Sequence, residues 1–210
     1  MRDEAIKGAR ELTEDSDLLS RSYELAAAAH ADQTRKDNGA PYVTHPVRVA
    51  ELIRGAGFDE EVQAAALLHD VVEDSDVGVE EIDRRFGPRV AGIVAALTED
   101  ESIPGYERRK AEHRDRVEAA GADAIAVYAA DKLSNLRDMR GLYAQVGERA
   151  AERFTAPLGL RSRLWLDDAE MAERGLPGSE LPGALRAEAE GFVADRAQGG
   201  AWEEERTAAG

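Results

Sequence analysis

The segment from Ala64 to Asp74 is the stretch of this sequence that most restricts how the chain can fold. At about 100° per residue, a helix places the apolar side chains of this segment on one face and its polar side chains on the other. The polar residues are His69, Asp70, Glu73 and Asp74. Three carboxylates and an imidazole crowded together repel one another unless a cation or water screens them. The segment therefore predicts a helix with one face in the core and the other around a divalent metal ion.

The rest of the chain also favours helices. Alanine-rich or amphipathic runs predict helices at about residues 18–36, 47–56, 59–74, 79–86, 122–139, 148–155, 158–174 and 180–197, with a further one beginning at Pro88. The sequence shows no repeat, no alternating strand pattern and no glycine-rich nucleotide loop. The predicted fold class is therefore all α.

Composition limits the classes of partner. A chain of 210 residues has room for one domain with a short tail. The net charge of -16 opposes binding to nucleic acid and to anionic membranes. The chain has no cysteine, no apolar signal segment at its start and no run of about 18 apolar residues. We expect a soluble cytoplasmic protein that binds neither nucleic acid nor membrane.

Two residues outside the first segment can complete a metal site. His45 stands at the start of one predicted helix, and Asp131 lies among apolar residues of another. Each also has a structural explanation, because a histidine there can cap the helix and Lys132 or Arg137 can neutralise Asp131. Together with the first segment they give two imidazoles and two carboxylates, a mixed set suited to one first-row divalent ion with positions open for water and substrate. The four candidate ligands are His45, His69, Asp70 and Asp131.

Two groups of basic residues can bind phosphate in this acidic protein. Arg35 and Lys36 are expected at the end of a helix, where the helix dipole equally favours solvated cations. The run Tyr106–Lys110 is the densest positive cluster, and it fits a solvated helix face as well as a phosphate clamp. His30 and His113 are expected to be structural or surface residues.

Several of these segments, in this order, resemble the hydrolase domain of RelA/SpoT proteins. They are Arg35-Lys36, Pro41–Pro46, Ala65–Ser75, Phe86-Gly87 and Ala130–Arg137. The segment Glu107–Lys110 also resembles the small, stand-alone Mesh-type alarmone hydrolases. The similarity covers about residues 20–140, and weaker similarity continues to about residue 195.

The resemblance implies an HD-domain bundle of about ten helices that binds one Mn²⁺ through the four candidate ligands. It implies a 3′-pyrophosphohydrolase that converts guanosine tetra- or pentaphosphate to GDP or GTP and pyrophosphate, by attack of metal-bound hydroxide. Glu73 and Asp74 would hold and deprotonate the water, or would instead orient His69 from outside the ligand set. The expected organisation is a polar segment (1–17), the HD-domain phosphohydrolase (18–197) and an acidic, flexible tail (198–210).

Eight residues are expected to contact the guanosine polyphosphate, either through their charge or because they match the family motifs. They are Arg35, Lys36, Arg109, Lys110, Lys132, Asn135, Arg161 and Trp165. Packing or a salt bridge explains Lys132 nearly as well. Trp165 stands where Mesh-type proteins usually have tyrosine, so it can stack but offers no hydroxyl. The alternatives are the same metal site acting on another phosphorylated nucleotide, and a nucleotide-binding module without catalysis.

Overall fold

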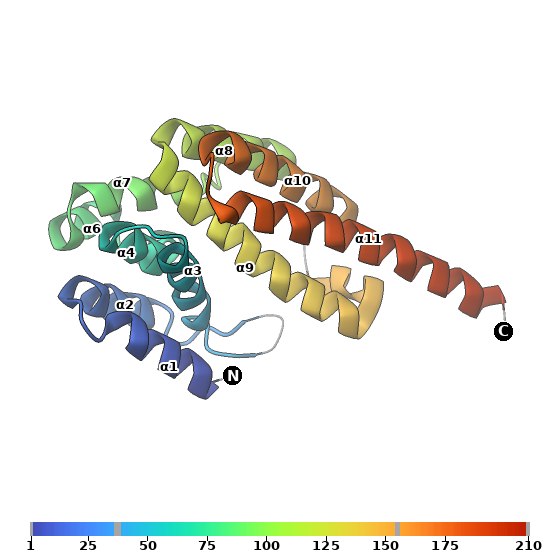
Figure 1. Ribbon diagram of the computed structural model, residues 1–210, viewed down its shortest axis with the longest axis horizontal. Coiled ribbons are helices and arrows are strands. Elements are labelled where there is room, and N and C mark those ends of the chain that lie inside the picture. Colours follow the sequence, from blue (N-terminus) through green and yellow to red (C-terminus); the bar gives the residue numbers. More distant parts are fainter. Residues whose placement is uncertain (1, 36–38, 154–155, 209–210) are drawn as a thin grey trace.

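The computed structural model describes the backbone of residues 2–35, 39–153 and 156–208, and side chains only between residues 8 and 198. All regular elements in these ranges are helices, and they form one bundle (Figure 1). The single β pairing within them is an isolated bridge between Thr34 and Pro41. The predicted all-α fold is therefore confirmed.

Eleven α-helices and one 3₁₀ segment follow one another with short connections in the described parts of the chain. The elements are α1 (Arg2–Thr13), α2 (Asp17–Ala29), α3 (Thr44–Gly55), α4 (Glu60–Leu68), α5 (Val71–Asp74), α6 (Val79–Phe86), α7 (Pro88–Leu97), α8 (Tyr106–Ala120), α9 (Ala122–Val146), η1 (Gly147–Arg153), α10 (Leu158–Gly175) and α11 (Glu180–Ala208). Among these elements, none is a helix long and apolar enough to cross a membrane. The cytoplasmic location stays a prediction.

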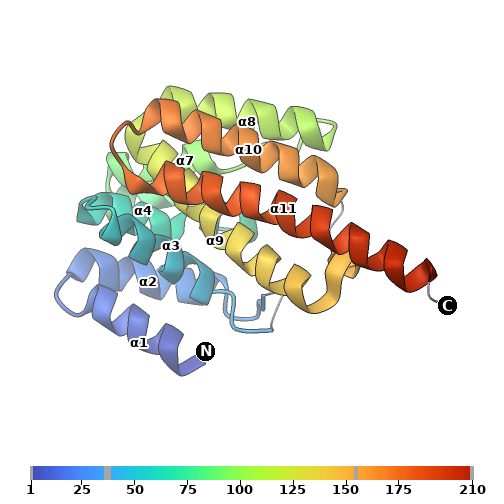
Figure 2. The same ribbon diagram turned by 45° about the vertical axis from the view of Figure 1, so that its right-hand side comes forward.

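Helix α9 lies in the middle of the bundle. It packs against α3, α4, α7, α8, α10 and α11, and the two ribbon views place α3 and α4 on one side of it and α10 and α11 on the other (Figures 1 and 2). Its residues Ala126, Ala129 and Ala130 are fully buried. Because alanine side chains are short, neighbouring helices can lie close to the α9 backbone. Residues on α9 therefore face both halves of the molecule.

Glycine and proline set the boundary between α6 and α7 where the sequence predicts it. Gly87 has φ +92°, a conformation that favours glycine, and its N–H donates to Asp83 at the end of α6. Pro88 then begins α7, where its missing N–H costs nothing.

The helix predicted over about 59–74 is interrupted at His69 and Asp70. Helix α4 ends at Leu68, and the one-turn helix α5 begins at Val71. His69 Nδ1 donates to the carbonyl of Ala66 at 2.8 Å, and Asp70 has φ -94° and ψ -7°, outside regular helix. This turn replaces the continuous polar face that we expected.

Helix α2 ends at Ala29, well before Lys36, so Arg35 does not stand at a helix terminus. The following loop folds back on itself, because Arg35 N donates to Ala40 and Tyr42 N donates to Gln33. These bonds replace the helical ones and explain the early end. Lys36 lies outside the described residues.

The other differences concern the ends of the chain and of α9. Helix α9 passes through Gly141 and continues to Val146, and residues 147–153 form a 3₁₀ turn within the predicted helix 148–155, whose last two residues lie outside the described ones. Helix α11 continues beyond residue 197 to Ala208. Segment 1–17 contains α1, which packs on α3 and buries Ala9 and Leu12 in the core. The division into three regions stays a prediction.

Candidate active site

The structure brings the four candidate metal ligands together at the centre of the bundle. His45 lies in the first turn of α3, His69 and Asp70 form the turn between α4 and α5, and Asp131 lies on α9. Nε2 of His45 is 3.0 Å from Oδ1 of Asp131, and Nε2 of His69 is 3.2 Å from Oδ2 of Asp70. The pairs His69–Asp131 and His45–Asp70 are each separated by 3.8 Å. The ligand atoms of His45, His69 and Asp131 all lie within 4.8 Å of one another, and Asp70 approaches this group through the two histidines.

Neighbouring groups fix the orientation of these ligands. Because Nδ1 of His69 donates to the Ala66 carbonyl, it is Nε2 that faces the cluster and would become the ligand atom once its proton is lost. That Nε2 is buried and has no hydrogen-bond partner among the described residues. His45 Nδ1 lies 3.2 Å from Ser134 Oγ, and Asp70 Oδ2 accepts a hydrogen bond from the Tyr42 hydroxyl at 2.7 Å. An unpaired, buried nitrogen beside two carboxylates fits a bound cation.

The electrostatics of the cluster favour a cation as well. Burial lowers the pKa of His45, although Asp131 opposes it. Burial also acts to lower the pKa of His69, but the charges of Asp70 and Asp131 outweigh it and raise that pKa well above its usual range. Burial would raise the pKa of Asp70, yet the charge of His69 holds it below its usual range. The carboxylates therefore stay ionised, and a cation can replace the proton on His69.

The predicted catalytic pair on α5 points in two directions. Glu73 Oε1 accepts a hydrogen bond from the backbone N–H of Glu99 at 2.5 Å, in the connection after α7. Asp74 Oδ2 instead lies 3.6 Å from Nδ1 of His30, at the end of α2. Although Glu73 is exposed on one side, its partial desolvation raises its pKa to about 7, and the charges of Asp70 and Glu99 add to this effect while the N–H of Glu99 opposes it. Glu73 is therefore a carboxylate that titrates near neutral pH.

A pocket of about 190 Å³ between α8, α9 and α10 collects five of the predicted substrate contacts. They are Lys110, Lys132, Asn135, Arg161 and Trp165, and the lining also includes Tyr106, Leu164 and Asp168. Lys132 Nζ lies 2.7 Å from Oδ2 of Asp131, and Asn135 donates to its Oδ1 at 2.5 Å. The pocket therefore adjoins the metal-ligand cluster.

Trp165 and Arg161 form one wall of this pocket. The Trp165 side chain is buried against Phe192, with ring centroids 5.5 Å apart, and the Arg161 guanidinium lies 5.0 Å from the Trp165 ring. Arg161 also donates to the Tyr106 hydroxyl at 3.1 Å. Trp165 thus contributes mainly apolar packing, and a hydroxyl near this wall comes from Tyr106.

The remaining predicted cations are held by carboxylates. Arg109 and Lys110 both bind Glu99, whose side chain was not among the predicted site residues. Arg35, in the loop after α2, donates to Asp138 at 2.5 Å and to Asn135 Oδ1 at 3.4 Å. Apart from the acidic run 99–101, no sequence signal marks Glu99 or Asp138, because each partner lies elsewhere in the chain.

A third carboxylate missed by the sequence, Asp168, lies in the pocket lining. It is buried, and it accepts hydrogen bonds from the Tyr128 hydroxyl at 2.9 Å and from Arg114 at 3.3 Å. Lys132 Nζ lies 4.4 Å from the Tyr128 ring. The salt bridge that we considered as an alternative role for Lys132 is present, and it coexists with a position in the pocket.

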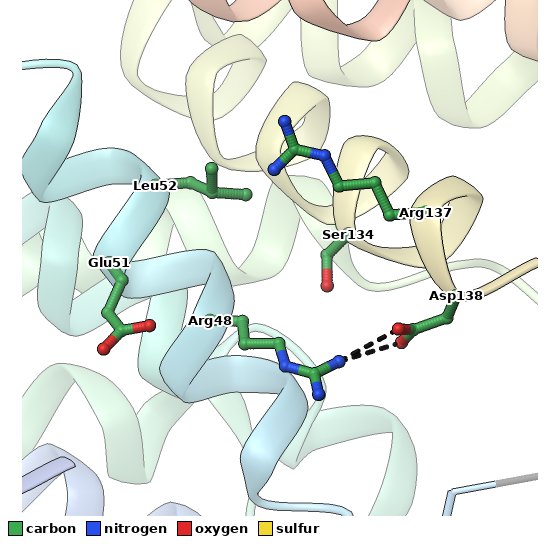
Figure 3. Close-up of a pocket in the computed structure, with 6 residues that line it drawn as sticks. All are labelled: Arg48, Glu51, Leu52, Ser134, Arg137 and Asp138. Carbon is green, nitrogen blue, oxygen red and sulfur yellow. Dashed lines mark hydrogen bonds and ion pairs between the residues drawn. The ribbon is translucent and has the colours of Figure 1, made fainter. Parts of the chain in front are cut away.

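A second cavity, of about 390 Å³, lies between α3 and α9 (Figure 3). It is lined by Arg48, Glu51, Leu52, Ser134, Arg137 and Asp138. Arg48 donates to both oxygens of Asp138, at 2.9 and 3.2 Å, so Asp138 joins Arg48 to Arg35. The residues that line this cavity include no predicted site residue, and one of them, Ser134, contacts His45 of the ligand cluster.

The fold and the site together define a class of protein: an all-α bundle with a histidine–aspartate cluster at its centre. Comparison with known families identifies this class. Residues 22–158 match the HD domain family, and the chain belongs to this family. The predicted resemblance to RelA/SpoT-type HD-domain hydrolases, and among them to the Mesh-type enzymes, is also confirmed, because similar proteins carry these names.

Two of these relatives are named guanosine-3′,5′-bis(diphosphate) 3′-pyrophosphohydrolase MESH1. The Danio rerio protein is 44% identical over 128 residues, which cover 58% of this chain and 69% of the relative. The Homo sapiens protein is 40% identical over 124 residues, with the same coverage of 58% and 69%. Both names belong to the enzyme class of the prediction, a hydrolase.

Longer proteins and a solved structure give the same family. A Synechocystis protein named probable guanosine-3′,5′-bis(diphosphate) 3′-pyrophosphohydrolase is 36% identical over 170 residues, 77% of this chain. The match spans only 22% of that relative's own length. A solved structure, described as that of a metazoan ortholog of SpoT that hydrolyzes ppGpp, matches with a TM-score of 0.63 and 30% identity, covering 86% of this chain and 96% of that one.

Proposed function

We propose that this protein is a Mn²⁺-dependent guanosine-3′,5′-bis(diphosphate) 3′-pyrophosphohydrolase, which converts guanosine tetra- or pentaphosphate to GDP or GTP and pyrophosphate. The observation that carries the proposal is the junction at Asp131. One of its oxygens lies against His45 and the other against Lys132, so a single carboxylate joins the ligand cluster to the cationic pocket. The printed names of the relatives support the choice of substrate.

The proposed metal ligands are His45, His69, Asp70 and Asp131. Two imidazole nitrogens and two carboxylate oxygens form a mixed donor set that suits a first-row divalent ion, and the resemblance to RelA/SpoT hydrolases favours Mn²⁺. When bound, a divalent ion lowers the pKa of coordinated water and polarises phosphoryl oxygens. The hydrogen bonds from Tyr42 to Asp70 and between Ser134 and His45 would keep the ligands oriented.

Glu73 is the proposed proton acceptor. A carboxylate with a pKa of about 7 is half ionised at neutral pH, which suits a group that takes up a proton and then returns it. The N–H of Glu99 holds one of its oxygens and leaves the other available. Asp74 is proposed to assist from the opposite side of α5, where it faces His30.

The proposed phosphate contacts are cations that offset the net charge of -16 locally. Lys110, Lys132 and Arg161 line the pocket, where they would meet the diphosphate groups. Arg35, Lys36 and Arg109 are proposed to contact the rest of the substrate, while Asn135 offers a neutral amide near the cluster. Trp165 would contribute an apolar wall to this site.

Product analysis tests the proposal. Metal-stripped protein, resupplied with Mn²⁺, is incubated with guanosine tetraphosphate and a panel of other nucleotides, alongside Asp70→Ala and the matched variant Asp76→Ala, whose side chain is exposed. Release of pyrophosphate and GDP by wild type and Asp76→Ala, but not by Asp70→Ala, would support the proposed activity.

Two other outcomes would reject it. Turnover of a different nucleotide alone would keep the metal site but replace the substrate. Binding of nucleotides without turnover of any of them would favour the binding module.

A further inference from the structure

Glu99 occupies the centre of the predicted phosphate clamp. Its Oε2 lies 2.9 Å from Nε of Arg109, its Oε1 binds Nζ of Lys110, and Nδ1 of His113 lies 3.5 Å from the same oxygen. The Glu99 side chain is only 15% exposed. A largely enclosed carboxylate therefore holds both cations of α8 that we assigned to phosphate.

The surroundings of this carboxylate are those that suit a phosphate group. Lys110 also lines the pocket that contains Lys132 and Arg161, and the positive charge of Lys132 acts on Glu99. Lysine and arginine donors directed at one anion make the strong, charge-assisted hydrogen bonds that bind phosphate. An incoming phosphate would meet the same donors that Glu99 already uses.

We propose that Glu99 is a specificity-determining residue, whose carboxylate competes with the phosphates of the ligand for Arg109 and Lys110. The inference rests on the proposed function for the identity of the substrate. A ligand with a single phosphate gains little by displacing an enclosed carboxylate. A diphosphate has more charge and more acceptor oxygens, so it competes better. Glu99 therefore selects against small anions, because they must displace its carboxylate from Arg109 and Lys110 before they can bind.

The backbone N–H and the side-chain carboxylate of Glu99 have different partners, so their roles can be tested separately. Its backbone N–H binds Glu73, whereas its side chain binds the cations of α8. Replacement by glutamine removes the competing charge but leaves the backbone bond to Glu73 in place. The proposal thus predicts a change in anion affinity. Because the charge of Glu99 also helps to raise the pKa of Glu73, the rise of kcat with pH should move to lower pH in this variant.

The experiment measures the Kd of inorganic pyrophosphate by calorimetry at one fixed Mn²⁺ concentration, for wild type, Glu99→Gln and Glu101→Gln. Glu101 is exposed on the same connection, so its replacement makes the same change in net charge away from the cations. We expect Glu99→Gln to bind pyrophosphate about fivefold more tightly, the scale of one partly exposed ion pair. Glu101→Gln is expected to match wild type.

Further variants make the result decisive. Combining Glu99→Gln with Lys110→Gln should remove the gain, and Glu99→Asp, which keeps the charge, should stay near wild type. Glu99→Ala provides a second neutral variant if Glu99→Gln does not fold. Unchanged or weaker pyrophosphate binding in folded neutral variants would overturn the proposal.

The two proposals can fail independently. If wild type does not hydrolyse guanosine tetraphosphate, the proposed function is rejected, but the pyrophosphate affinities still decide the role of Glu99. If wild type is active, Glu99→Gln should also lower KM for the alarmone.

Discussion

The ligand cluster and the adjoining pocket share α9 but are held together by different forces. In the cluster, His69 and Asp70 are fixed by uncharged partners, the Ala66 carbonyl and the Tyr42 hydroxyl. In the pocket, the cations are fixed by carboxylates, as Lys110 is by Glu99. The geometry of the cluster follows from core packing, whereas that of the pocket follows from charge balance. Substitutions in the two regions should therefore fail in different ways.

Asp131→Asn should have the largest effect, because Asp131 belongs to both regions. The variant loses the negative charge of one proposed metal ligand, and it also loses the ion pair with Lys132. We expect activity to fall by more than about a hundredfold, beyond the 10- to 100-fold cost of losing a group that only supports a ligand. Metal content after dialysis and rates of product release measure both losses. Asp115→Asn, at an exposed position on α8, is the matched control, and full Mn²⁺ retention in Asp131→Asn would contradict the prediction.

Glu73→Gln should reduce kcat by about a hundredfold or more while leaving Mn²⁺ bound, because general-base catalysis contributes on that scale. Glu73 must be ionised to accept a proton, and its pKa is raised to about 7 in the metal-free protein. A bound cation would lower that pKa, so wild-type kcat/KM should rise with pH and level off at or below about pH 7. The variant should lack this rise. A pH profile shared by both proteins would exclude Glu73 as the base.

Tyr42→Phe tests whether uncharged partners hold the cluster together. It removes one hydrogen bond to Asp70 Oδ2 and leaves the ring in place. We expect Mn²⁺ affinity to fall about 10- to 100-fold, with activity recovered at high Mn²⁺. Titration of activity with Mn²⁺ measures the shift, and Tyr23→Phe on α2 serves as the control. Activity that stays low at saturating Mn²⁺ would show that Tyr42 acts on the substrate instead.

Arg161→Gln should have the smallest effect and should be confined to the pocket. Loss of one charge-assisted contact should raise KM for guanosine tetraphosphate by about tenfold, with kcat and Mn²⁺ affinity nearly unchanged. Steady-state kinetics at several salt concentrations measure this change, and Arg163→Gln on the exposed face of α10 is the control. A tenfold fall in kcat at unchanged KM would place Arg161 in the chemical step.

The proximity of the four candidate ligands could be predicted from the sequence because local signals mark them. His69 and Asp70 interrupt an apolar run, and Asp131 is a carboxylate among apolar neighbours. The turn between α4 and α5 could not be predicted, since helical periodicity does not register a break of two residues. Similarly, Gly141 suggested an end for α9, but the cost of about 1 kcal/mol for glycine in a helix is offset by burial of Leu142 and Tyr143.

The pocket was predicted less completely, for a physical reason. Lys132 and Asn135 follow from their spacing to Asp131 along one helix. Glu99 and Asp138 act through ion pairs with residues from other elements, and such contacts leave no pattern in a single sequence. The positive cluster of α8 could be recognised, but the carboxylate that neutralises it could not.

The central helix also determines which changes in length the molecule can accommodate. Between Asp131 and Asp138, α9 advances by roughly 10 Å and keeps both side chains on one face. One extra residue inserted between Asp131 and Asn135 would turn Asn135 and Asp138 by about 100° around the helix axis relative to Asp131. Asp138, which holds Arg35, would then separate from the cluster, and the buried residues Leu136 and Met139 would turn away from the core. The spacing of residues along α9 thus fixes the relative positions of the side chains in the site. A change in the length of this helix should disturb the site more than a change in the length of a loop.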